Sequence, residues 1–212
     1  MIITQSLLDP RVKRALLDGK IIVAKTDTIY GILTRAEDEK AVKGLYNIRP
    51  RDPEKSCIIL VSNLSDIPHL TESQQNTYLK MRSLRPTTVV VFAPDTNLAH
   101  LTQADGTLAF RLVSGELAEL IQQTGPLIAP SANPEGLPPA KNIKEAIDYF
   151  NEKVTVYVDG GECLENTPSQ IINFPQIDTE EVFYHLLVIL SSLMHLFALF
   201  HHLLQLTTLS IL

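Results

Sequence analysis

Short apolar runs and amphipathic segments follow one another along the chain in an irregular order. The run IIVA at residues 21–24 is continuous, apolar and partly β-branched, which is typical of a strand buried on both faces. Strand-like runs of the same kind occur at residues 57–61, 88–92, 108–112, 127–129, 154–158 and 170–172.

Segments with helical spacing separate several of these runs. Asp9 and Pro10 resemble an N-cap and a first helical position, the apolar residues that follow fall on one face, and Gly19 suits the end of a helix. Further helices are predicted at residues 39–46, 116–123 and 143–150. The mixed order and uneven spacing argue against a regular βαβ repeat and predict an α/β fold, a single domain with a mixed, twisted sheet and flanking helices.

Length and composition agree with one domain and an appendage. The chain has 212 residues, 45% of them apolar and 20% charged, which is a globular composition. The net charge of −6 argues against bulk electrostatic binding of nucleic acid, so any contact with RNA would be weak and local. Cys57 and Cys163 lack CxxC spacing, and the N-terminus lacks a signal-peptide core. A cytoplasmic location is therefore expected.

The composition changes abruptly near the C-terminus. Residues 182–212 contain no Asp, Glu, Lys or Arg, 21 of the 31 residues are apolar, and four of the six histidines lie here. We therefore divide the chain into a domain at 1–175 and a hydrophobic tail at 176–212. Three interpretations of the tail are open: a membrane-spanning helix, a helix packed on the body or on a partner, and an aberrant reading frame.

The common nucleotide-binding and hydrolase signatures GxxxxGK[ST], GxGxxG, HExxH and GxSxG are absent. Four polar clusters instead lie at strand ends, where α/β proteins usually bind ligands. The first, KTDTIYG at 25–31, either lines a pocket or forms a strand-to-helix turn capped by Thr and Asp. The second, RPRDPEKS at 49–56, carries three cations that could clamp a polyphosphate, although charge runs also form solvated loops.

The other two clusters extend the list of candidates. Strand alternation places Thr107, Ala109 and Arg111 on one face, and Arg111 then needs either a carboxylate ligand or an internal salt bridge. Ser131 and Asn133, in APSAN at 129–133, offer neutral hydrogen bonds beside small residues. A simple Ser/Asn turn is the alternative.

Taken in order, the clusters resemble the YrdC/Sua5 family over residues 10–173. The segment TDTIYG resembles the family's PT[DE]TVYGL, and RPRDPEKSC resembles its KxR…[KN]PL loop. Four further segments resemble PGPxTxVL, TVAVR, [AS][PT]SAN and DGG…PSTIVD: PTTVVVF at 86–92, TLAFR at 107–111, APSAN, and DGG at 159–161 with PSQIIN at 168–173.

The resemblance implies a fold and a set of site residues. The family's mixed, twisted sheet surrounds a concave, positively lined cavity. Residues that it places near threonine are Thr26, Arg111, Ala129 and Ser169, with Arg111 meeting the carboxylate. Residues that it places at the nucleotide phosphates are Arg49, Arg51, Lys55, Thr107, Ser131 and Asn133, of which the catalytic cations are Arg49, Arg51 and Lys55. No residue is assigned to a protein-bound metal.

The implied reaction is the synthesis of threonylcarbamoyl-adenylate and pyrophosphate from ATP, L-threonine and bicarbonate, for N6-threonylcarbamoyladenosine in tRNA. Mg²⁺ would accompany ATP, and separate threonylcarbamoyl transferase proteins would use the product. The alternative is a catalytically impaired YrdC-like protein that binds nucleotide or double-stranded RNA. A carbamoyl-transfer domain of the hydrogenase-maturation type normally lies in a much longer chain with zinc-finger modules, which this sequence lacks.

The chain departs from the family pattern at three places. Lys25 replaces the usual Pro and is expected to add a flexible cation near the mouth of the pocket, and Arg49 replaces the usual Lys. No residue after Asn173 matches the family's LRxG-type motif, whose arginine helps to hold ATP. An aberrant reading frame would explain both the missing arginine and the unusual tail.

Overall fold

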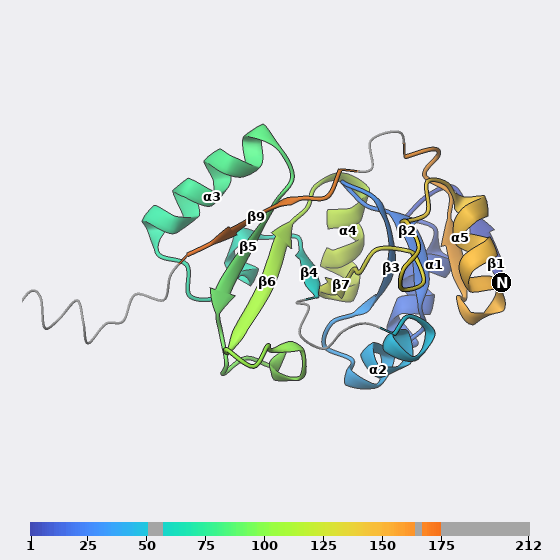
Figure 1. Ribbon diagram of the computed structural model, residues 1–212, viewed down its shortest axis with the longest axis horizontal. Helices are drawn as coiled ribbons and strands as arrows, with labels where there is room; N and C mark the ends of the chain where they lie inside the picture. Colours follow the sequence, from blue (N-terminus) through green and yellow to red (C-terminus); the bar gives the residue numbers. More distant parts are fainter. Residues whose placement is uncertain (51–56, 164–166, 175–212) are drawn as a thin grey trace, which may run out of the picture. The chain divides into compact units, whose positions relative to one another are not determined.

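A mixed β-sheet runs through the computed structural model, which describes residues 1–50, 57–163 and 167–174 (Figure 1). Within these ranges the strands are β1 (Ile2–Thr4), β2 (Ile22–Lys25), β3 (Tyr30–Arg35), β4 (Ile58–Val61), β5 (Thr87–Phe92), β6 (Thr107–Leu112), β7 (Leu127–Ile128), β8 (Val156–Val158) and β9 (Gln170–Asn173). The α-helices are α1 (Pro10–Leu17), α2 (Glu39–Ile48), α3 (Glu72–Leu84), α4 (Gly115–Thr124) and α5 (Ile143–Phe150).

The strand order is β1-β8-β2-β3-β7-β4-β6-β5-β9. The pairs β1–β8, β2–β8, β4–β6 and β5–β9 are parallel, whereas β2–β3, β3–β7, β4–β7 and β5–β6 are antiparallel. The prediction of a mixed sheet with flanking helices is confirmed.

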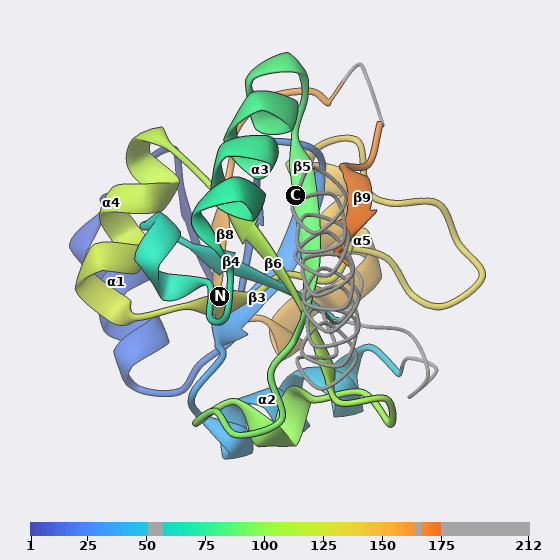
Figure 2. The ribbon, with the colours of Figure 1, turned by 90° about the vertical axis from the view of Figure 1, so that its left-hand side faces the viewer.

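Side-chain alternation along the strands divides the interior into two cores. In β2, Ile22 and Ala24 pack with α1 and α4, which lie together on one face of the sheet (Figure 2). Val23, between them, belongs to the larger core of the other face, to which α2, α3 and α5 contribute. A strand buried on both faces must be apolar at every position, which explains the continuous run IIVA.

Helix α1 begins and ends where its sequence predicts. The Asp9 side chain accepts a hydrogen bond from the Arg11 backbone N–H at 2.8 Å, and Pro10 is the first helical residue. Gly19 follows the helix with φ at +67°, a conformation that glycine adopts without steric cost.

Among the strands and α-helices, three were not predicted, namely β1, β3 and α3. The interpretation of residues 25–31 as a strand-to-helix turn is wrong, because Thr26–Ile29 connect the antiparallel strands β2 and β3. Polar and small residues interrupt the apolar run of β3, although its positions 30–34 are fully buried. Helix α3 buries only Tyr78, so it has no apolar stripe, but Thr71 and Gln74 form a capping box that marks its start.

The described residues belong to one compact unit, Met1–Phe174. The predicted tail and the three interpretations of it lie outside the described residues. In the part of the chain that is described, no helix is both long enough and apolar enough to cross a membrane.

Candidate functional site

A cavity of about 270 Å³ opens where several strand ends meet. The β2–β3 turn, β4, β5, β6, β9 and the segment after β7 all contribute to its walls. Along β5 and β6, Thr88, Val90, Ala109 and Arg111 line the cavity, while the residues between them belong to the larger core. The sheet therefore places a buried arginine and several hydroxyl groups on one concave surface.

The four residues predicted near threonine come together in this cavity. Thr26 lies in the β2–β3 turn, Arg111 in β6, Ala129 directly after β7, and Ser169 directly before β9. They are far apart in the sequence, so only the tertiary fold makes them neighbours. Their role in binding threonine remains a prediction.

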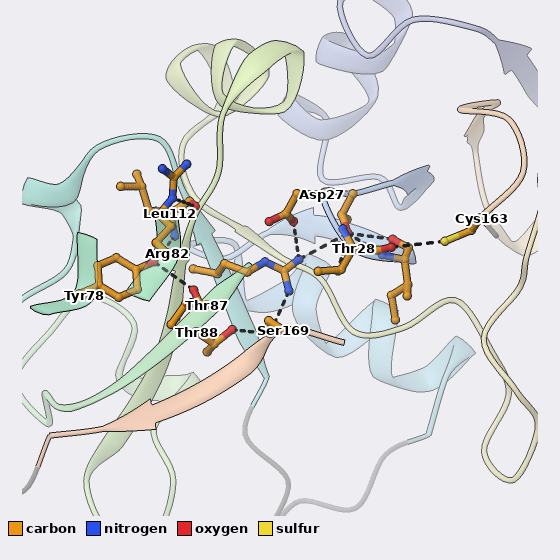
Figure 3. Close-up of polar contacts among 12 residues, drawn as sticks. Asp27, Thr28, Tyr78, Arg82, Thr87, Thr88, Leu112, Cys163 and Ser169 are labelled. Carbon is orange, nitrogen blue, oxygen red and sulfur yellow. Dashed lines mark hydrogen bonds and ion pairs between the residues drawn. The ribbon is translucent and has the colours of Figure 1, made fainter. Parts of the chain in front are cut away.

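Arg111 is 4% exposed, and its guanidinium contacts Asp27 and Ser169, both of which are labelled in Figure 3. Its Nη2 is 2.9 Å from Asp27 Oδ1 and donates to Thr26 Oγ1 at 3.4 Å, and its Nη1 donates to Ser169 Oγ at 3.4 Å. Nε is buried, and no described residue forms a hydrogen bond with it. The internal salt bridge that the sequence left open is therefore present.

Burial lowers the pKa of Arg111, and the nearby Asp27 carboxylate opposes that shift. An arginine starts from so high a pKa that it remains charged at neutral pH. The cavity therefore contains a charged, partly desolvated guanidinium, and Asp27 compensates part of its charge.

Hydroxyl groups around Arg111 are held in place by their own hydrogen bonds. Thr88 Oγ1 and Ser169 Oγ are 2.8 Å apart and connect β5 to the start of β9. Thr26 Oγ1 donates to the Ile29 carbonyl at 2.8 Å and accepts from the Thr28 and Ile29 backbone N–H groups at 3.3 Å each. The turn thus fixes the Thr26 hydroxyl beside the arginine.

The DGG segment at residues 159–161 supports the β2–β3 turn from outside. Tyr30 Oη donates to the Gly161 carbonyl at 2.8 Å and accepts from the Gly160 backbone N–H at 3.0 Å. A Cβ on Gly160 would lie 2.7 Å from Lys25 Cβ, so the close approach requires glycine. The Lys25 ammonium donates to the Glu162 carbonyl at 2.9 Å and does not line the cavity, which corrects the expectation of a flexible cation at its mouth.

The predicted phosphate-binding residues are only partly assembled at the cavity. Arg49 is 7% exposed, and it donates from Nε to the Ser131 carbonyl at 2.8 Å and from Nη2 to Ser131 Oγ at 3.1 Å. Its Nη2 also contacts Asn133 Oδ1 at 3.5 Å. Ser131 lines the cavity, whereas Arg49 and Asn133 do not. Arg49 bonds to Ser131, and Asn133 contacts Arg49.

Of the remaining members of the phosphate set, only Thr107 is among the described residues, and it lies elsewhere. Thr107 is not part of the cavity lining, and its hydroxyl donates to Asp105 Oδ1 at 2.6 Å. Arg51 and Lys55 lie outside the described residues. The role of the whole set in binding ATP remains a prediction.

Two residues at the site had no role assigned from the sequence, Asp27 and Thr88. Both lie in segments that match the family motifs, but a motif does not show that Asp27 pairs with Arg111 or that Thr88 bonds Ser169.

As for metals, the described ranges contain no group of three or more His, Cys, Asp or Glu side chains able to hold an ion.

Comparison with known proteins gives the chain a family. Residues 14–182 match the profile of Sua5, YciO and YrdC proteins, whose description is "Telomere recombination". The match covers most of the chain. This chain belongs to the Sua5/YciO/YrdC family.

Individual members of the family show similar coverage. Threonylcarbamoyl-AMP synthase of Cellvibrio japonicus is 30% identical over 77% of this chain and 91% of its own length. Among solved structures, Sua5 of Pyrococcus abyssi in complex with L-threonine has a TM-score of 0.72 at 24% identity, over 84% of this chain and 55% of that one. YciO of Escherichia coli has a TM-score of 0.68 at 19% identity, over 83% and 89%. These structures share the fold of this Sua5/YciO/YrdC member.

Proposed function

We propose that this family member is an L-threonylcarbamoyladenylate synthase, an enzyme that makes threonylcarbamoyl-AMP and pyrophosphate from ATP, L-threonine and bicarbonate. The observation that carries the proposal is the cavity, in which Arg111 is surrounded by the hydroxyls of Thr26, Thr88 and Ser169. A relative that matches over most of its length is named threonylcarbamoyl-AMP synthase, and a Sua5 structure of the same fold contains L-threonine.

The cavity suits a small zwitterion with a polar side chain. Arg111 provides a buried positive charge for the carboxylate, and the hydroxyls can exchange hydrogen bonds with polar groups of the ligand. Ile58, Val90 and Ala109 supply apolar walls that would contact the aliphatic part.

The reaction is nucleotidyl transfer. The amino nitrogen of threonine first bonds to the carbon of bicarbonate, and a C–O bond breaks as water leaves, which gives the N-carboxylated amino acid. An oxygen of its new carboxylate then bonds to the α-phosphorus of ATP, the bond from that phosphorus to the bridging oxygen breaks, and pyrophosphate leaves with the electron pair. Arg49, Ser131 and Asn133 would bind the phosphates. Arg51 and Lys55, which lie outside the described residues, would contribute two further cations. Mg²⁺ held by the phosphates would supply further charge neutralisation.

The product implies a following step in the cytoplasm, in which a separate transferase moves the threonylcarbamoyl group to adenosine in tRNA. Direct contact of this chain with RNA would be weak, since its net charge of −6 opposes binding to phosphate backbones.

The test is release of pyrophosphate from ATP by the full chain, measured with both threonine and bicarbonate and with each left out. The proposal expects release that requires both, and a product with the mass of threonylcarbamoyl-AMP. Release that does not depend on threonine, or no release from folded protein, would contradict the proposal. In the second case, retained binding of nucleotide or double-stranded RNA would identify the impaired binding protein instead.

A further inference from the structure

Arg111 has a single carboxylate partner among the described residues, Asp27, at 2.9 Å. The arginine side chain is 5% exposed and that of Asp27 is 27% exposed, so a buried cation is paired with an anion close to the surface. A buried charge that loses its partner is strongly destabilised, and it moves or takes up water in response. The position of Arg111 therefore depends on Asp27.

Asp27 reaches the arginine from outside the cavity. Thr26 and Thr28, on either side of it in the chain, line the cavity, but Asp27 does not. In Figure 3, Asp27 and Ser169 lie on opposite sides of the side chain to which dashed lines join them both, and these contacts are those with Arg111. The carboxylate consequently holds Arg111 without occupying the space in which a ligand would lie.

The hydrogen bonds of the guanidinium leave room for a second anion. The contact with Asp27 is the short one, and the contacts of Nη2 with Thr26 and of Nη1 with Ser169 are both 3.4 Å long. A planar guanidinium has five N–H donors, and long contacts of this kind are readily exchanged for the stronger bonds of a carboxylate. A ligand carboxylate can therefore bind the Nη1–Nη2 edge while Asp27 keeps its place on Nη2.

We propose that Asp27 is a positioning residue, which holds the Arg111 guanidinium at the angle needed to receive the carboxylate of the amino-acid substrate. The inference rests on the proposed function and adds a residue to it. A competing role is that Asp27 mimics the substrate carboxylate and must be displaced. The two roles predict opposite changes, because removal of a competitor tightens substrate binding and removal of a positioning group weakens it.

The experiment compares Asp27→Asn with the wild type in steady-state pyrophosphate release, with threonine varied at saturating ATP and bicarbonate. We expect the KM for threonine to rise by about 10- to 100-fold, as for loss of one partner of a buried charge pair, with a much smaller change in kcat. The KM for ATP should stay within about twofold. Asp148→Asn is the matched control, because Asp148 is exposed on α5, and it should leave all constants unchanged.

A second measurement separates positioning from simple loss of structure. L-Threoninamide lacks the carboxylate, so its inhibition constant should be similar in the wild type and in Asp27→Asn, whereas threonine binding weakens. A general loss of structure would weaken both ligands and lower kcat, and would overturn the proposal. Asp27→Glu, which restores the charge, should recover part of the affinity for threonine.

The outcomes distinguish the two proposals. An unchanged or lower KM for threonine in Asp27→Asn, in a wild type that is active, overturns the positioning role and leaves the synthase proposal intact. Absence of threonine-dependent release in the wild type rejects the synthase proposal itself. Asp27→Ser removes the same carboxylate with a smaller side chain, and it carries the same prediction if the Asn variant does not fold.

Discussion

Thr87 and Thr88 are adjacent on β5 and allow the contribution of one hydroxyl to binding to be separated from its contribution to stability. Both are fully buried. Thr87 bonds to Gln170, the first residue of β9, and Thr88 bonds to Ser169, the residue before it. Thr88 lines the cavity and bonds Ser169 Oγ at 2.8 Å. Thr87 faces away from it, donates to the Arg85 carbonyl at 2.8 Å and accepts from Gln170 Nε2 at 2.8 Å.

Replacement of either threonine by valine removes the hydroxyl and keeps the volume nearly the same. Thr88→Val loses one hydrogen bond, and should lower the free energy of unfolding by about 0.5–1.5 kcal/mol. Thr87→Val loses two and should cost about 1–3 kcal/mol, with a fall in Tm of roughly 2–4 °C for each kcal/mol. Only Thr88→Val frees the Ser169 hydroxyl, so it alone should raise the KM for threonine, by about five- to tenfold.

The assay pairs urea denaturation of each variant with its threonine dependence of pyrophosphate release. The expected pattern is a larger loss of stability in Thr87→Val and a larger loss of affinity in Thr88→Val. An equal rise in KM for both variants would mean that the affinity follows general stability. An unchanged KM in Thr88→Val would show that the Thr88–Ser169 hydrogen bond has no part in substrate binding. Either result refutes the reasoning.

Two further predictions concern stability. Tyr78 Oη accepts from the Leu112 backbone N–H at 2.8 Å and donates to the Thr87 carbonyl at 3.2 Å. Tyr78→Phe should therefore lower the free energy of unfolding, measured in urea, by about 1–3 kcal/mol. Tyr149→Phe on α5 is the control and should lower it much less. Hydrogen bonds from the side chain and backbone of Arg11 hold the pKa of Asp9 below its ordinary 3.8. The ionised Asp9 therefore stabilises the folded state fully above about pH 4, and this stabilisation is lost as the pH falls from there toward the lowered pKa of the folded state. Asp9→Asn should therefore unfold more easily than the wild type at pH 7, and the difference should shrink below about pH 4; a difference that does not change with pH would contradict this account.

Much of the fold could be predicted because its signals are local. The N-cap at Asp9 and the helix stop at Gly19 mark α1 on either side of its apolar face. Strands such as β2 are apolar at nearly every position because both faces are covered. Helix α3 has no such signal, since it buries one tyrosine and is held by hydrogen bonds from Tyr78 and Arg82 to residues of β5 and β6.

The sequence by itself determined the residue types of the site and their order: an arginine on an apolar strand, and hydroxyl-bearing segments at strand ends. Only the tertiary structure decided which of them meet. It placed Thr26, Arg111 and Ser169 around one cavity, kept Thr107 off its lining, and paired Arg111 with Asp27. The physical reason is that pairing between strands distant in sequence depends on the whole sheet, whereas caps, turns and burial patterns depend on neighbours in the chain.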